Sequence, residues 1–256
     1  MSAALEVSPV ALPTINSVWI GRELGAVHVA CLRSFLRQGH KVVLHCYAPP
    51  HDVPIGVEIA DASSLIPEAQ IARYLEGGHF ALISDLLRYE IAGNGLYVDC
   101  DVFCLRPIEN ADYIFGLGHN YGIQNAVLKL PQDCPALANL RAIKNSPVFR
   151  PPWQKAKRVG WLRVGGEAKP LEELKWGTIG PGALSYYAKQ HGLMQYAAPI
   201  ARFYPVHWTC TSMFLDPSLS LKDVVTSRTD ALHLYHNSWK TSSIPEGSPL
   251  WEIARS

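Results

Sequence analysis

One continuous run, from Ser84 to Asp101, limits the possible folds of this chain more than any other stretch. Its first part has apolar residues at helical spacing, and a turn at Asn94-Gly95 follows. The next three residues, Leu96 to Val98, have the apolar character of a short buried strand. Because this strand ends directly in the carboxylates of Asp99 and Asp101, the run predicts part of an α/β sheet with an acidic pair at the carboxyl end of a strand.

The acidic pair is a candidate metal site. Ligands of open α/β sheets bind outside the carboxyl ends of the strands, and buried strands do not normally end on unpaired charge. The hard oxygen ligands of Asp99 and Asp101 suit Mn²⁺ or Mg²⁺ carrying a diphosphate. Asp-x-Asp is also a short pattern, and most instances in proteins are loop carboxylates that face water. The two residues alone leave both interpretations open.

Strand, helix and strand alternate before this run. The segment Ile15 to Ile20 predicts a strand, Val27 to Gln38 has helical spacing, and Lys41 to Cys46 alternates like a second strand. Short turns join the three, as in the βαβ unit of a parallel sheet. We expect further strands at 57–60, 114–116 and 122–130, and helices at 68–75, 80–92, 135–144 and 178–191.

Length and composition predict a single domain. The chain has 256 residues, of which 48% are hydrophobic, and this is enough to bury one core. We therefore expect one domain over residues 1–256. Residues 146–177, rich in Pro, Gly, Lys and Trp, are the least regular part and predict an irregular loop or small lobe over the site.

Several classes of function are disfavoured. The formal charge of +1 and the absence of a lysine- or arginine-rich run argue against a nucleic-acid partner. The chain has neither a P-loop nor Gly-x-Gly-x-x-Gly, which argues against a kinase and a nicotinamide dehydrogenase. No secretion signal or transmembrane segment is visible. We expect a cytoplasmic protein, with peripheral membrane association or secretion as an effector as alternatives.

The motifs together resemble the DXD-motif glycosyltransferases of the family-32 type and, more distantly, the glucosylating bacterial toxin domains. The pattern of that family is Ser-Asp-x-x-Arg-Tyr, a Gly-Gly turn, an aromatic strand residue and Asp-x-Asp. The chain has Ser84 to Tyr89, then Asn94-Gly95 in place of Gly-Gly, then Tyr97 and the acidic pair. Asn tolerates positive φ nearly as well as Gly, so this departure is mild.

The resemblance implies an α/β fold of the GT-A type, with a mostly parallel central sheet and flanking helices. It implies a Mn²⁺- or Mg²⁺-dependent hexosyltransferase that moves a sugar from a UDP-sugar to a glycan, lipid-linked or other acceptor, with retention, as in polysaccharide biosynthesis. An effector or toxin-like transferase that glycosylates protein shares every motif and is the main alternative. A nucleotide-sugar-binding module without turnover is disfavoured by the intact acidic and basic residues. The sequence does not identify the sugar, the acceptor, the linkage or the oligomeric state.

The same resemblance assigns roles to the Asp/Arg helix and to two aromatic positions. Asp85 would hold hydroxyl groups of the donor sugar, and the guanidinium of Arg88 would support the sugar or the diphosphate. With Asp101, these are the expected catalytic residues. Trp19 occupies the Trp-x-Gly position whose indole stacks on the nucleobase, although its position alone favours a core tryptophan. Asn125 would lie near the sugar.

The C-terminal part supplies the remaining residues. His233-x-x-x-x-Ser238-Trp239 resembles the ending of the family. Trp239 would contact the phosphates, and Ser238 would contribute to nucleotide-sugar and metal binding. Together with Asp99 and Asp101, the resemblance implies His233 and Ser238 as metal ligands. His233 aligns with the family, but His236 is closer to Ser238 and competes for this role.

Overall fold

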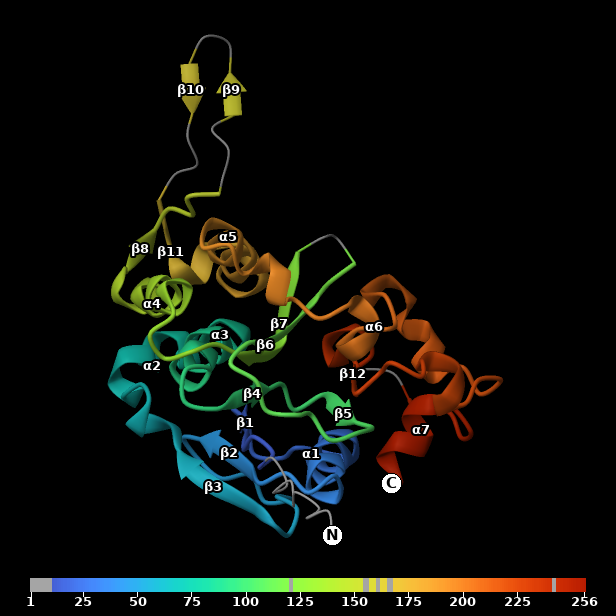
Figure 1. Cartoon of the computed structure of the whole chain (residues 1–256). Coiled ribbons are helices and arrows are strands. Elements are labelled where there is room, and N and C mark those ends of the chain that lie inside the picture. Colours follow the sequence, from blue (N-terminus) through green and yellow to red (C-terminus); the bar gives the residue numbers. More distant parts are fainter. Residues whose placement is uncertain (1–10, 120–121, 154–156, 160–161, 165–167, 241–242) are drawn as a thin grey trace, which may run out of the picture.

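The computed structural model describes residues 11–119, 122–153, 157–159, 162–164, 168–240 and 243–256, and has a mixed α/β fold around a six-stranded sheet (Figure 1). The strand order is β3-β2-β1-β4-β7-β6. The first four strands of this order run parallel, and β7 is antiparallel to both β4 and β6. The predicted class, α/β with a mostly parallel sheet and flanking helices, is confirmed.

The central sheet comprises β1 (Ile15–Val18), β2 (Val42–Cys46), β3 (Val57–Asp61), β4 (Leu96–Val98), β6 (Ile114–Leu117) and β7 (Ile123–Lys129). The helices are α1 (Ala26–Arg37), α2 (Glu68–Glu76), α3 (Phe80–Ile91), α4 (Pro135–Ala142), α5 (Ala183–Gln190), α6 (Ile200–Phe203) and α7 (Pro249–Ala254). Most of these lie within a few residues of the predicted bounds. The short α6 and α7 were not predicted.

Successive side chains of β4 point into two different buried layers, one on each side of the sheet. Leu96 and Val98 pack with α1 on one side of the sheet, and Tyr97 packs with α3, α4 and α5 on the other. Side chains two residues apart on a strand share a face, so Tyr97 and the following Asp99 point toward α3. The short β4 therefore directs one acid of the pair toward the helix that carries Arg88.

A separate two-stranded ladder ties the C-terminal part to the acidic pair. β5 (Val102–Cys104) follows Asp101 directly and pairs antiparallel with β12 (Ala231–His233), with His233 opposite Val102. β5 was not predicted. Beside this ladder, α7 packs against α1 through a buried apolar cluster (Figure 1). None of the helices in the described ranges is long and apolar enough to span a bilayer.

The segment 146–177 is more regular than predicted. It contains two antiparallel pairs, β8 (Val148–Phe149) with β11 (Lys169–Pro170) and β9 (Lys157–Val159) with β10 (Leu162–Val164). The β9–β10 hairpin extends away from the rest of the molecule (Figure 1). Residues 154–156, 160–161 and 165–167 of the predicted loop lie outside the described residues. Composition alone did not reveal these strands, because each has only two or three residues, too few to show a period.

Candidate functional site

The two acids lie on a tight connection between β4 and β5. The backbone N–H of Asp99 donates to the carbonyl of Ala126 on β7 at 2.8 Å, which continues the sheet by one residue. The N–H of Val102 then donates to the carbonyl of Asp99 at 3.1 Å and closes the turn. This turn places Asp101 at the start of β5, beside the strand that ends in His233.

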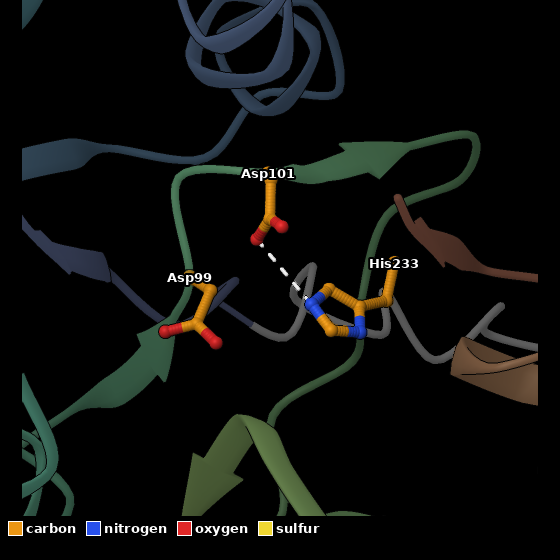
Figure 2. Close-up of side chains that lie close together, drawn as sticks. All are labelled: Asp99, Asp101 and His233. Atoms are coloured by element: carbon orange, nitrogen blue, oxygen red, sulfur yellow. Dashed lines mark ion pairs between the residues drawn. The ribbon is translucent and has the colours of Figure 1, made fainter. Parts of the chain in front are cut away.

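The β5–β12 ladder brings His233 to the acidic pair. Leu234 donates its backbone N–H to the carbonyl of Asp101 at 2.9 Å, and His236 donates its N–H to Asp101 Oδ2 at 2.8 Å. The Nε2 atom of His233 lies 3.4 Å from Asp101 Oδ1. Figure 2 shows the carboxylate of Asp101 facing the His233 ring, with the Asp99 carboxylate beside them.

These three side chains form a cluster that can hold a metal ion. One ligand atom each of Asp99, Asp101 and His233 lies within 4.8 Å of the others. Two carboxylate oxygens and one imidazole nitrogen are a donor set that fits a divalent cation such as Mn²⁺. The buried Nδ1 atom of His233 has no hydrogen-bond partner among the described residues, so none of these holds the ring in its present orientation through that atom.

The charge distribution at Asp101 favours a cation. Although burial opposes ionisation, the adjacent His233 and the N–H of His236 hold the pKa of Asp101 below its usual range. Burial disfavours the charged form of His233 as well, but the Asp101 carboxylate raises the pKa of that ring. The ring of His236 instead lies against those of His28 and Trp239, so His233, not His236, belongs to the cluster.

Arg88 joins this cluster to Asp85. Its guanidinium donates from Nη1 to Asp85 Oδ1 at 2.5 Å and from Nη2 to Asp99 Oδ1 at 2.6 Å. The Arg88 side chain is only 5% exposed, so the predicted helix pair is not a solvent-exposed salt bridge. A planar guanidinium can bridge two carboxylates in this way, whereas a lysine ammonium cannot match the geometry.

Asp85 is about as buried as Asp101 but has different polar neighbours. Asn125, on β7, donates its side-chain N–H to Asp85 Oδ1 at 2.9 Å. A Cβ atom on Gly180 would lie 2.6 Å from Asp85 Oδ2, so the backbone can approach this carboxylate only because residue 180 has no side chain. The hydroxyl of Tyr89 donates to the carbonyl of Ile179 at 2.6 Å and holds this segment in place. Burial raises the pKa of Asp85 to about 6, and the charge of Arg88 only partly opposes this.

Each of the three carboxylates has one oxygen held by the protein. Oδ1 of Asp85 accepts from Arg88 and Asn125, Oδ1 of Asp99 accepts from Arg88, and Oδ2 of Asp101 accepts the N–H of His236. Within the described residues, the second oxygen of Asp85 and Asp99 has no hydrogen bond, and that of Asp101 faces His233. The arrangement therefore fixes each carboxylate and leaves the second oxygen of Asp85 and of Asp99 available to a ligand, while that of Asp101 is paired with His233.

The predicted aromatic residues have different environments. Trp19 is half-buried just after β1, with its ring 4.7 Å from that of His28. Trp239 is only 5% exposed, and its indole N–H donates to the carbonyl of Leu234 at 2.7 Å. In this conformation the protein itself uses the indole N–H, and a role of Trp239 at the phosphates stays a prediction. The preceding residue, Ser238, is exposed.

Tyr97 is a part of the site whose role sequence reasoning missed. Its hydroxyl donates to Asp99 Oδ1 at 2.6 Å and lies 3.1 Å from the hydroxyl of Ser84. The guanidinium of Arg88 lies over the Tyr97 ring, 4.6 Å from its centroid. The available signal was a tyrosine in a strand that is otherwise wholly apolar, since a buried phenol hydroxyl usually has a polar partner.

No protein-family profile matches the chain, and no curated protein matches it. Among solved structures, the fold is similar to that of the PaToxG glycosyltransferase, with 12% identity and a TM-score of 0.44 over 70% of this chain and 69% of that chain. Likeness at this level does not transfer a function, so the functional argument depends on the residues of the site.

Proposed function

We propose that this chain is a metal-dependent glycosyltransferase that transfers a sugar from a UDP-sugar to a glycan acceptor, with retention of configuration. The observation that carries the proposal is the row formed by Asp101, Asp99, Arg88 and Asp85. It has a metal-binding cluster at one end and a buried carboxylate with a free oxygen at the other. A nucleotide diphosphate sugar has the same two parts, an anionic diphosphate and a neutral sugar rich in hydroxyl groups.

Asp99, Asp101 and His233 would hold the divalent cation, with Mn²⁺ or Mg²⁺ as the candidates. Such an ion supplies positive charge where negative charge grows on a departing diphosphate. The protein contribution is to fix the three ligands in advance. Tyr97 and Arg88 orient Asp99, and the His236 N–H orients Asp101.

Arg88 and Asp85 would bind the donor sugar next to this ion. Oδ2 of Asp85 is free to accept a sugar hydroxyl, while Asn125 and Arg88 prevent the carboxylate from turning. The positive charge of Arg88 lies between Asp85 and Asp99, close to where the sugar and the diphosphate would meet. Donors that are fixed before the reaction contribute strongly to stabilising developing charge.

The nucleobase would lie near Trp19. His28 contacts both Trp19 and His236, and His236 binds Asp101 through its backbone, so the indole belongs to the surroundings of the metal cluster. The choice of uracil, the retention of configuration and the glycan acceptor come from the resemblance of the ordered motifs. They are part of the proposal.

A panel of UDP-sugars incubated with Mn²⁺ and no acceptor tests the proposal through release of UDP. We expect hydrolysis of at least one donor by the wild-type protein, and loss of hydrolysis with EDTA or with Asp99→Asn. Asp112→Asn, an exposed acid outside the site, is the matched control and should retain activity. The proposal fails if no nucleotide sugar is hydrolysed, or if hydrolysis persists in excess EDTA.

A further inference from the structure

A cavity adjoins Asp85 on the side of α3. This cavity, of about 250 Å³, lies between the start of α3 and the segment from Leu171 to Ile179, and Asp85 is among the residues that line it. The cavity is therefore continuous with the carboxylate that we assign to the donor sugar. Nothing in the motif pattern of the sequence had indicated it.

Two aromatic rings line this cavity and remain exposed. Trp176 is 79% exposed and Phe80 is 49% exposed, although both are large and apolar. Within the described residues neither ring packs against another aromatic ring. Exposed aromatic side chains gathered at a concave surface are typical of a binding site, because their flat faces bury apolar area when a ligand covers them.

The polar groups of the cavity are of both signs. Lys175 supplies a positive charge and Glu172 a negative one, while the start of α3 has no side-chain cap to accept its first N–H groups. Glu172 Oε2 is buried without a hydrogen bond, and the guanidinium of Arg73 is 3.8 Å away. With Asp85 the lining has two carboxylates and one ammonium group, which disfavours an anion, and these mixed donors and acceptors suit a ligand with many hydroxyl groups.

We propose that this cavity binds a neutral carbohydrate acceptor, whose apolar C–H face lies on Trp176 and Phe80 while its hydroxyl groups bond to Glu172 and Lys175. The inference rests on the proposed function, because Asp85 would then hold the donor sugar at the edge of the acceptor site. Two flat rings beside a few hydroxyl-binding groups match the two faces of a sugar. An extended peptide, the other class of acceptor, would require a longer groove or a free strand edge.

Saturation-transfer NMR of the full chain with Mg²⁺ and UDP tests this inference. The probes are maltotriose, cellotriose, mannotriose and chitotriose, each added separately. We expect transfer to at least one of them in the wild-type protein. Trp176→Ala should weaken the affinity for that sugar by about tenfold to a hundredfold, the range for losing the burial of a large apolar side chain. Trp208→Ala is the matched control, because Trp208 is 52% exposed and does not line the cavity.

The outcomes separate the inference from the proposed function. Transfer to no sugar overturns the inference, as does equal weakening by Trp176→Ala and Trp208→Ala. Binding of short unglycosylated peptides, with no sugar bound, also overturns it. Metal-dependent hydrolysis of a UDP-sugar is measured on the same preparations. If hydrolysis is present and sugar binding is absent, only the acceptor site is wrong. If hydrolysis is absent, the proposed function itself has failed. Circular dichroism confirms that each variant is folded.

Discussion

The Asp101 and Asp85 ends of the site contain the same functional group in opposite environments. At Asp101, His233 and a backbone N–H favour the charged form and hold the pKa low, despite burial. At Asp85, burial dominates and raises the pKa to about 6. Arg88 lies between Asp85 and Asp99, the acid next to Asp101. The difference agrees with the proposed function, in which one end would hold a cation and the other would bond the neutral hydroxyl groups of a donor sugar.

The largest effect is expected at the Asp101 end. Asp101→Asn removes a charged ligand, and we expect turnover to fall by about a hundredfold or more, since the metal contributes several kcal/mol to the transition state. Mn²⁺ binding, measured by electron paramagnetic resonance, should weaken in parallel. Asp112→Asn is the control. Unchanged Mn²⁺ affinity in a folded Asp101→Asn protein would show that the two ends do not differ in the way we describe.

The Asp85 end is tested by the pH dependence of stability. The folded protein binds a proton on Asp85 up to pH of about 6, whereas the unfolded chain releases it near pH 3.8. The contribution of this group is therefore fully present below about pH 4 and is lost as the pH rises through about 6, by on the order of 3 kcal/mol. Urea unfolding at pH 4.5 and 7 measures it. The difference between wild type and Asp85→Asn should change with pH, and a constant difference contradicts the raised pKa.

Arg88→Lys tests the bridge between the two ends. Lysine keeps the positive charge but cannot donate to Asp85 and Asp99 in the same plane, so we expect turnover to fall at least about tenfold, or 1.4 kcal/mol. UDP affinity should change little, because the nucleotide is held by other residues. The control is Arg106→Lys, since Arg106 is exposed and lies outside the site, where it donates to the carbonyl of Thr229 at 2.9 Å and pairs with Asp230 at 3.9 Å. Wild-type kinetics of Arg88→Lys would assign the bridge a purely structural role.

The smallest effect is expected from Tyr97→Phe, which removes the hydroxyl that donates to Asp99 and also contacts Ser84 and Arg88. The free energy of unfolding should fall by about 1 kcal/mol, the net value of a buried hydrogen bond. Turnover should fall several-fold, because Asp99 is less well oriented. Calorimetry and donor hydrolysis measure the two effects. Tyr196→Phe, at a half-exposed ring, should alter neither. If Tyr97→Phe loses stability with full activity, the hydroxyl supports the sheet and not the metal end.

The fold was largely predictable because its main elements have local signals. The helical spacing of apolar residues in α1 and α3, and the short apolar run of β4, can be recognised within each segment alone. The grouping of Asp99 with Asp101 followed from the position of both after one strand. Their proximity to Arg88 followed from a resemblance, and the structure adds the bridge that Arg88 forms.

The parts that were missed depend on distant pairing. β5 and β12 are three residues each, too short to show a period, and their register is set only when the chain is folded. The burial of Trp239 has the same origin, since it packs with residues of α1 and α7. A tyrosine within the apolar strand β4 indicated a buried hydroxyl with a polar partner. That this partner is Asp99 could be identified only from the structure, where both side chains point toward α3.

The pairing of β5 with β12 has a consequence for the order of assembly. Asp101 and His236, which are hydrogen-bonded just beyond the ends of this ladder, are 135 positions apart in the chain. During synthesis the acidic pair leaves the ribosome long before the imidazole of His233 exists. Contacts of such wide separation also form slowly when a chain refolds. Mn²⁺ binding should therefore appear after the helical signal in stopped-flow refolding. Under the proposed function, the ability to bind the ion would then mark a fully folded molecule.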